Sequence, residues 1–146
     1  MNIFIKRVDV KNYAPVLFKL DVNIFTRSYH RSATSLETFI QDYGNCSAYL
    51  VYDEVKPVGF MVFEDKSSFI EIYEFGLLPQ YQHKGIGTLL LQDFLKRIKN
   101  KKIHLLTHPF NSIAIIFYLK YGFTLSAWKD DYYKNGQPRV LLKKEE

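Results

Sequence analysis

The stretch LLPQYQHKGIGTLLLQDFLKRIK, from Leu77 to Lys99, decides the fold of this chain. An apolar run stops at Pro79, opens into the glycine turn Gln82-His83-Lys84-Gly85-Ile86-Gly87, and resumes as an amphipathic pattern. That pattern predicts a helix to about Asn100, with one apolar stripe formed by Ile86, Leu90, Phe94 and Ile98. A strand therefore passes through a glycine turn directly into a helix.

Three interpretations of the glycine turn compete. It can be a purely structural strand-to-helix turn. A nucleotide-binding P-loop is excluded because Lys84 precedes the glycine instead of following it, and the dinucleotide fingerprint fails because Leu90 stands where a third glycine is needed. The third interpretation is a different diphosphate cradle. Backbone N–H groups of residues 83–88 would then point at an anion at the positive end of the helix, and glycines 85 and 87 would leave room for it.

Composition limits the class of protein. The 146 residues suit a single domain, residues 1–146, and 47% hydrophobic content can build a core. No apolar run reaches the roughly 20 residues of a membrane span, and the first ten residues do not resemble a signal peptide. Cys46 is the only cysteine, so no internal disulfide can form. We expect a cytoplasmic protein with no metal site.

The net charge of +5 favours anionic partners. Its densest cluster is the basic run Lys96, Arg97, Lys99, Lys101 and Lys102. The run is interpreted as the solvated side and end of a helix. Nucleic-acid binding is a less favoured alternative, because no zinc finger, basic zipper or arginine-rich arm accompanies the run.

Periodicity predicts a mixed α/β fold. Strands are expected at 3–8, 46–52, 58–63, 69–78, 102–107, 123–128 and 139–144. Helices are expected at 12–25, from a capping box at Thr34–Glu37 to near Gly44, from the glycine turn to about 100, and at 112–121. Strands 46–52 and 58–63 should form a hairpin. The order β-α-α-β-β-β-α-β-α-β-β implies mostly antiparallel strands followed by one strand-helix-strand crossover.

The glycine turn resembles the Gln/Arg-x-x-Gly-x-Gly/Ala signature of the GNAT N-acetyltransferases, which bind the pyrophosphate of acetyl-coenzyme A. As in that family, it follows a strand and opens a helix. Twenty-four residues past Gly87, the stretch NSIAIIFYLKYGF is similar to the second motif of the family, through Asn111, Ala114, Phe117, Tyr118, Gly122 and Phe123. The specific resemblance covers residues 58–128, and the two motifs occur in the expected order.

The resemblance implies a fold with flanking helices and a bulged fourth strand that splays from the fifth, with Leu77 as the bulge residue. The pantetheine arm would pair with the exposed strand edge like an added strand. The cofactor-binding residues so implied are Phe75, Gly76, Leu77, Gln82, His83, Lys84, Gly85, Ile86, Gly87, Thr88 and Asn111. The N–H of Leu77 is the candidate donor to the thioester oxygen.

The implied reaction is direct attack of a primary amine on acetyl-CoA in a ternary complex. Tyr118 occupies the position of a frequent general acid of the family, since a phenol pKa near 10 suits a thiolate leaving group. The alternative for Tyr118 is a core tyrosine. The candidate bases are Glu71, where several family members place a glutamate, and Glu74. Three positions apart, these two should face opposite sides of a regular strand unless a bulge intervenes.

Other positions also offer candidates for the general base. Some family members that acetylate protein N-termini carry a glutamate on the next strand, where this chain has Leu106. His104 and His108 lie nearby as further candidates. A water chain is a further alternative.

The acceptor amine also has several candidates. The tail DDYYKNGQPRVLLKK resembles that of the bacterial ribosomal-protein alanine N-acetyltransferases, whereas a plain edge hairpin turning at 135–136 and blunted by Pro138 explains it equally. Asp130 and Asp131 could attract a cationic amine, and residues 29–31 could touch it. The alternatives are a small amine (polyamine, amino acid or aminoglycoside) and a non-catalytic CoA-binding module. The resemblance further implies that the chain can form a homodimer.

Overall fold

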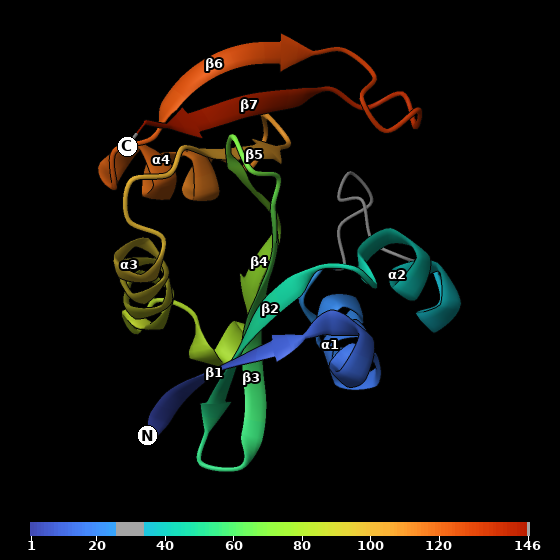
Figure 1. Cartoon of the computed structure of the whole chain (residues 1–146), viewed down its shortest axis with the longest axis vertical. Helices are drawn as coiled ribbons and strands as arrows, with labels where there is room; N and C mark the ends of the chain where they lie inside the picture. The colour runs from blue at the N-terminus through green and yellow to red at the C-terminus, as the bar shows by residue number, and fades with distance from the viewer. Residues whose placement is uncertain (26–33, 146) are drawn as a thin grey trace.

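The computed structural model describes residues 1–25 and 34–145, so the candidates at positions 29–31 lie outside the described residues. Its seven strands are β1 (Ile3–Asp9), β2 (Ser47–Asp53), β3 (Lys56–Asp65), β4 (Ile70–Leu77), β5 (Ile103–Thr107), β6 (Thr124–Lys129) and β7 (Arg139–Lys144). The helices are α1 (Val10–Ile24), α2 (Leu36–Tyr43), α3 (Ile86–Arg97) and α4 (Ser112–Lys120), with a short 3-10 turn η1 (Pro79–Tyr81). The predicted order is confirmed, and η1 is an addition that the sequence did not indicate (Figure 1).

One sheet joins the strands in the order β1-β2-β3-β4-β5-β7-β6. All neighbours are antiparallel except β4 and β5, which are parallel because α3 carries the chain across between them. The predicted hairpin of β2 and β3 is confirmed, and it turns at Glu54 with φ of 55°. The mixed, mostly antiparallel sheet with flanking helices matches the expected fold class (Figure 1).

The predicted capping box at the start of α2 is wrong by one residue. Ser35, not Thr34, is the N-cap, and its hydroxyl accepts a hydrogen bond from the Thr38 amide at 3.1 Å. Glu37 therefore stands in the first helical turn instead of closing a box. Both Thr34 and Ser35 satisfy the local pattern, so sequence alone did not distinguish them.

The hairpin of β6 and β7 lies at the edge of the sheet, as predicted, but Pro138 does not have the predicted place on that edge. Strand β7 lies between β5 and β6, so Pro138, just before β7, does not blunt the edge of the sheet. The connection from β6 to β7 spans residues 130–138. In this loop, the Gly136 amide donates to the Asp131 carboxylate at 2.7 Å.

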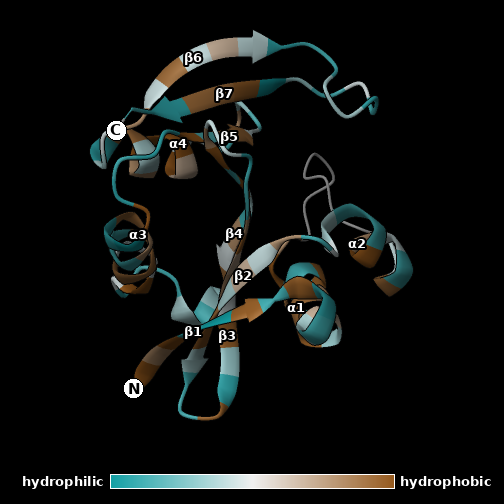
Figure 2. Cartoon of the chain, in the orientation of Figure 1, coloured by the Kyte–Doolittle hydropathy of each residue, from teal (hydrophilic) through white to brown (hydrophobic). Residues whose placement is uncertain are grey.

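Two hydrophobic cores cover the two faces of the sheet. On one face, α3 and α4 pack over a cluster that includes Met61, Phe63, Ile72 and Phe94. On the other face, α1 and α2 pack over a cluster around Phe39, Leu50 and Phe60. Helices α3 and α1 lie on opposite sides of β4 in Figure 1. Each of them carries both hydrophobic and hydrophilic residues, as Figure 2 shows. Within the described ranges, no helix is long and apolar enough to cross a membrane.

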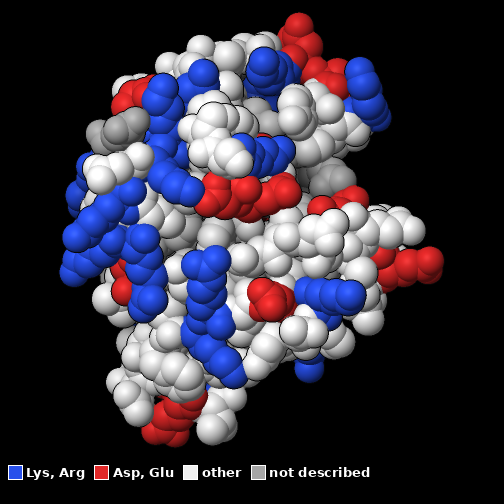
Figure 3. All heavy atoms as spheres, in the orientation of Figure 1, with Lys and Arg blue, Asp and Glu red and all other residues white. Residues whose placement is uncertain are grey.

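The basic run at the end of α3 is solvated, as favoured from sequence. Lysine and arginine side chains gather over α3 on the left of Figure 3. Arg97 pairs with Asp93 at 2.9 Å, and Lys101 pairs with Asp65. Lys96 and Arg97 lie in the last turn, where positive charge stabilises the negative end of the helix dipole.

Phe94 provides a test of the α3 core. It is fully buried and packs edge-on against Phe63, with ring centroids 5.1 Å apart. We expect Phe94→Ala to lower the free energy of unfolding by about 3–5 kcal/mol, through lost burial and a cavity. Leu89→Ala on the same helix, at a side chain 48% exposed, is the control and should cost less than about 0.5 kcal/mol in urea unfolding. Equal losses would contradict this packing.

Candidate active site

Strands β4 and β5 pair over only three residues and then part. The register joins Ile70 to Ile103, Glu71 to His104 and Ile72 to Leu105, and ends there. Beyond Ile72, β4 continues to Leu77 and pairs only with β3. A pocket opens where the two strands separate, and both strands contribute to its lining.

The unpaired edge of β4 offers backbone groups to a ligand. The Leu78 amide donates to the Val58 carbonyl of β3 at 2.8 Å. Because bonding alternates along an antiparallel pair, Leu77 and Phe75 direct their backbone groups away from β3, toward the parted side. The Gln82 side chain already donates to the Leu77 carbonyl at 3.0 Å on this edge. The Leu77 N–H thus faces the side where an added strand would lie.

The bulge of β4 lies at Tyr73, not at Leu77. Glu74 pairs with Val62 and Ile72 pairs with Phe63, so Tyr73 is the extra residue between them. Two neighbours, Tyr73 and Glu74, therefore turn toward the α1/α2 side, where both meet Tyr43. The bulge position implied by the family resemblance is therefore wrong. The pairing with β3 determines where the bulge lies, and the local sequence of β4 does not.

Gly76 is a point of close approach. A Cβ at this position would lie 2.7 Å from a side-chain carbon of Ile24 and 2.8 Å from the ring of Phe25. The end of α1 therefore presses directly on β4 beside the pocket. Only glycine permits this contact without displacement.

Tyr118 and Glu74 come together in the pocket from opposite sides of the sheet. Tyr118, on α4, is buried and packs against Phe75 and Phe123. Burial, and to a smaller degree the Glu74 carboxylate, raises the pKa of the Tyr118 phenol above its usual value. Glu74 is also buried, and its Oε1 accepts a hydrogen bond from the Tyr43 hydroxyl at 2.9 Å.

Glu71 lies apart from this pair. It is located where β4 still pairs with β5, and its carboxylate forms an ion pair with Lys66 at 3.2 Å. Glu71 does not line the pocket, whereas Glu74 does. Of the two predicted carboxylates, the structure brings only Glu74 to Tyr118.

The glycine turn presents the uncapped N-terminus of α3. Gly85 is the N-cap with φ of 82°, a left-handed conformation that favours glycine, and a Cβ there would meet no atom within 4 Å. In the part of the chain that the structure describes, no side chain caps this helix, and its first turn holds no acidic residue. His83 also has a positive φ, of 60°. The first amides of α3 thus face open space, which suits an anion.

The other predicted residues of the turn have internal contacts. Ile86, the first residue of α3, is buried, and the Thr88 hydroxyl accepts from the hydroxyl of Tyr121, the C-cap residue of α4, at 3.0 Å. A Cβ at Gly87 would stand at ordinary contact distance, 3.8 Å, from Leu77 and Phe75. Lys84 is exposed beside the turn. This end of α3 therefore adjoins the unpaired edge of β4.

Asn111 is the N-cap residue of α4. Its Oδ1 accepts from the Ala114 amide at 3.4 Å, and the residue also lines the pocket. His108 is buried nearby, and its Nδ1 accepts from the Phe110 amide at 3.0 Å. The proton of a neutral imidazole is then on Nε2, which lies 2.9 Å from Gln137 Oε1 and donates to it.

His104 lies outside the pocket. It stacks on Phe69, and its pKa is lowered, mainly by burial. Leu106 does line the pocket, at the strand position that lacks a glutamate.

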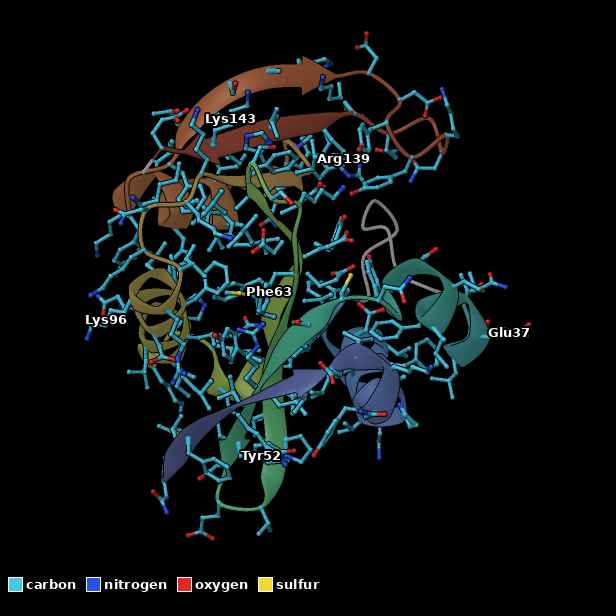
Figure 4. All side chains as sticks on the ribbon, viewed as in Figure 1. Glu37, Tyr52, Phe63, Lys96, Arg139 and Lys143 are labelled. Atoms are coloured by element: carbon cyan, nitrogen blue, oxygen red, sulfur yellow. The ribbon has the colours of Figure 1, made fainter. Side chains whose placement is uncertain are left out.

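Sequence reasoning gave no site role to several lining residues, among them Phe25, Tyr43, Tyr133 and Arg139. The Arg139 guanidinium lies 5.1 Å from the centre of the Tyr133 ring. In Figure 4 Arg139 lies just below β7. Tyr133 and Arg139 lie in the tail quoted above, but only the sheet order β4-β5-β7 brings them to the pocket. Phe25 and Tyr43 reach the pocket through the packing of α1 and α2.

The comparisons with known proteins agree with this arrangement. The sequence model described as "Acetyltransferase (GNAT) family" matches residues 15–123. No curated protein matches. Among solved structures, the ribosomal-protein-S18-alanine N-acetyltransferase from Escherichia coli superposes with a TM-score of 0.82 at 16% identity, covering 98% of this chain and 93% of the other.

Two further structures extend the likeness. A GNAT family acetyltransferase from Elizabethkingia anophelis with acetyl-CoA bound gives a TM-score of 0.78 at 22% identity, over 99% of both chains. Arabidopsis thaliana Naa50, in complex with the bisubstrate analogue CoA-Ac-MVNAL, gives 0.76 at 23% identity over the full length of both chains. At these identities the superpositions establish the fold.

The hydrogen bond between Tyr43 and Glu74 can be tested by stability. We expect Tyr43→Phe to lower the free energy of unfolding by about 1–3 kcal/mol, because it removes a donor from a buried carboxyl group. Tyr49→Phe is the matched control. Tyr49 is 1% exposed and its hydroxyl has no hydrogen-bond partner among the described residues, so loss of this hydroxyl should be neutral or stabilising. Equal destabilisation of both variants in urea unfolding would contradict the assignment.

Proposed function

Because the chain belongs to the acetyltransferase (GNAT) family, we propose that it transfers the acetyl group of acetyl-CoA to a primary amine by direct attack in a ternary complex. The observation that carries the proposal is a continuous path across neighbouring elements. It runs from the uncapped N-terminus of α3, along the unpaired edge of β4, to the pocket that holds Tyr118 and Glu74.

The N-terminus of α3 would bind the pyrophosphate of acetyl-CoA. The amides of residues 85–88 and the exposed Lys84 supply positive potential, and Gly85 leaves the approach open. The pantetheine arm would lie against Phe75, Gly76 and Leu77, with its amides bonded to the outward backbone groups of β4. Asn111 lines the far end of this path.

The backbone of β4 would stabilise the developing negative charge. As the amine nitrogen attacks the thioester carbon, electrons move onto the carbonyl oxygen. The outward N–H of Leu77 is the proposed donor to that oxygen. A fixed backbone donor in a closed site stabilises such charge strongly, because it needs no reorganisation during the reaction.

Two side chains would move the protons. An alkyl ammonium must lose a proton before attack, and Glu74 is the proposed base, oriented by the Tyr43 hydroxyl on its Oε1. When the carbon–sulfur bond breaks, the Tyr118 phenol gives its proton to the thiolate. The Tyr118 phenol is protonated at neutral pH, because its ordinary pKa is near 10 and burial raises this pKa further.

The acceptor is proposed to be a protein N-terminus. This proposal is supported by two superpositions. One is on the ribosomal-protein-S18-alanine N-acetyltransferase, and the other is on Naa50 in complex with the bisubstrate analogue CoA-Ac-MVNAL. Acetyl transfer to a peptide panel should then exceed transfer to polyamines, amino acids and aminoglycosides. Preference for a small amine would overturn the acceptor and leave the chemistry standing. Binding of CoA without any transfer would overturn the enzyme assignment.

Cofactor binding should depend on Gly85. We expect Gly85→Ala to weaken CoA binding in calorimetry by at least about tenfold, because a Cβ strains the left-handed turn and intrudes on the phosphate approach. Gly136→Ala is the matched control, since Gly136 also has a positive φ, of 77°, with no atom within 4 Å of a Cβ. Absence of CoA binding by the unmodified protein would refute the proposed function.

Tyr118→Phe should lower turnover by roughly 10- to 1000-fold while CoA still binds, because the thiolate would leave without a proton donor. Steady-state transfer measured beside calorimetry separates the two effects. Tyr49→Phe, another buried tyrosine outside the pocket, controls for loss of a hydroxyl. Unchanged turnover would remove the acid role from Tyr118.

A further inference from the structure

A second groove lies at the C-terminal end of α3. Its described lining combines four basic side chains, one carboxylate and three apolar side chains: Arg7, Arg97, Lys99 and Lys101, then Asp65, then Phe63, Ile70 and Ile98. None of these residues lines the pocket that holds Tyr118 and Glu74. Helix α3 has 12 residues, so at about 1.5 Å per residue its two ends are roughly 18 Å apart. The groove is therefore separate from the glycine turn at the other end of the helix.

Two aromatic rings hold the arginines of this groove in place. The Arg7 guanidinium lies 5.3 Å from the centre of the Phe63 ring, and the Arg97 guanidinium lies 5.8 Å from the centre of the Tyr49 ring. The two rings are buried and stack on each other, with centroids 5.3 Å apart. Neighbouring rings thus bring both arginines to one groove. A guanidinium already held over a ring loses little freedom when its planar fork binds an anion.

The ion pairs of the groove are exposed and leave it positively charged. Lys101 pairs with Asp65, and Arg97 pairs with Asp93 one turn earlier in α3. The side chains of these two pairs are 30–55% exposed, and such pairs contribute little in water. Among the described lining residues, Asp65 is the only carboxylate, against four cations. The hydrogen bond from Lys101 lowers the pKa of Asp65, and Arg7 lowers it further, so both cations act on the same part of the groove.

This lining has the chemistry of a phosphate site. Arginine forks bind phosphate oxygens in pairs, and lysines add charge beside them. The floor of Phe63 and Ile70 is 3% and 2% exposed, and an apolar floor strengthens the field of the cations above it. Arg7 comes from β1, whereas the other cations come from the end of α3 and the loop before β5. Cations that converge from two sides suit a compact anion better than a long chain.

We propose that this groove binds the phosphate or diphosphate group of a small phosphorylated molecule, held mainly by the forks of Arg7 and Arg97. The inference is independent of the acetyl-transfer chemistry, because the groove shares no residue with the proposed path of acetyl-CoA. An entering phosphate would replace Asp65 as the partner of Lys101. Asp65 is thus an internal competitor of the ligand. The basic run after α3 alone did not indicate this site, since Arg7 stands far from the run in the sequence.

Nuclear magnetic resonance titration of the full chain with inorganic pyrophosphate tests the proposal. The glycine turn can also bind an anion, so the readout is taken by residue: amide shifts at 7 and 97–101 report the groove, and those at 83–88 report the turn. We expect saturable shifts at the groove. Arg7→Gln should weaken binding there by about tenfold, because it removes a charged fork.

Lys6→Gln is the matched control for Arg7→Gln. It removes the same charge from the neighbouring position of β1, but side chains alternate along a strand, so Lys6 lies on the opposite face. There its Nζ donates to the Tyr13 hydroxyl at 2.7 Å. We expect the groove to bind pyrophosphate equally well in this variant. Absence of groove shifts in the unmodified protein, or equal losses in the two variants, would overturn the proposal.

Asp65→Asn tests the sign of the effect. This variant should bind pyrophosphate at the groove about two- to fivefold more tightly, because it removes the competing carboxylate from Lys101. No gain in affinity would contradict the assignment of Asp65 as a competitor, and with it the site. A single-stranded RNA that bound the groove more tightly than pyrophosphate would also overturn the proposal, since the groove would then serve a nucleic-acid backbone.

Discussion

The parting of β4 from β5 is the constraint on which the rest of the site depends. Parallel pairing over three residues holds the strands together at one end, and α3 must then cross between them. Because β4 remains bonded to β3, its other edge stays rigid while open. An exposed edge normally invites aggregation, so an edge inside a lined pocket is best understood as a template for an extended ligand.

The bulge at Tyr73 divides the chemistry between the two faces of the sheet. Phe75 points toward α4, where it packs against Tyr118, whereas Glu74 points toward α2 and Tyr43. In the proposed reaction, the sulfur would leave on the α4 side and the amine would approach from the α2 side. In this proposal, the gap between β4 and β5 would let groups from both faces of the sheet reach the carbonyl carbon of the thioester. The proposed proton donor, Tyr118, and the proposed proton acceptor, Glu74, therefore belong to separate elements, α4 and β4.

Local signals predicted the elements and the glycine turn, because glycine, proline and hydrophobic periodicity act over a few residues. The left-handed conformation of Gly85 and the capping by Asn111 belong to this class. The bulge at Tyr73 does not, since it depends on which residues of β3 lie opposite. Arg139 and Tyr43 were missed for the same reason: they reach the pocket through the order of the strands and the packing of α2, which no short segment encodes.

A comparison of the helix N-termini indicates that the N-terminus of α3 is suited to bind a ligand. Helix α2 begins with a capping serine and an acidic residue in its first turn, and α4 begins with a capping asparagine. Helix α3 has neither a side-chain cap nor an acid there, although its last turn carries Lys96 and Arg97. A cap contributes about 1 kcal/mol and an acid a further 0.3–1 kcal/mol, roughly. Helix α1 also lacks a side-chain cap hydrogen bond and an acid in its first turn, but its N-cap residue is the acidic Asp9, whereas the N-cap of α3 is the uncharged Gly85. Because stability favours negative charge at a helix N-terminus, the N-terminus of α3 fits a helix whose missing negative charge is supplied by a bound diphosphate.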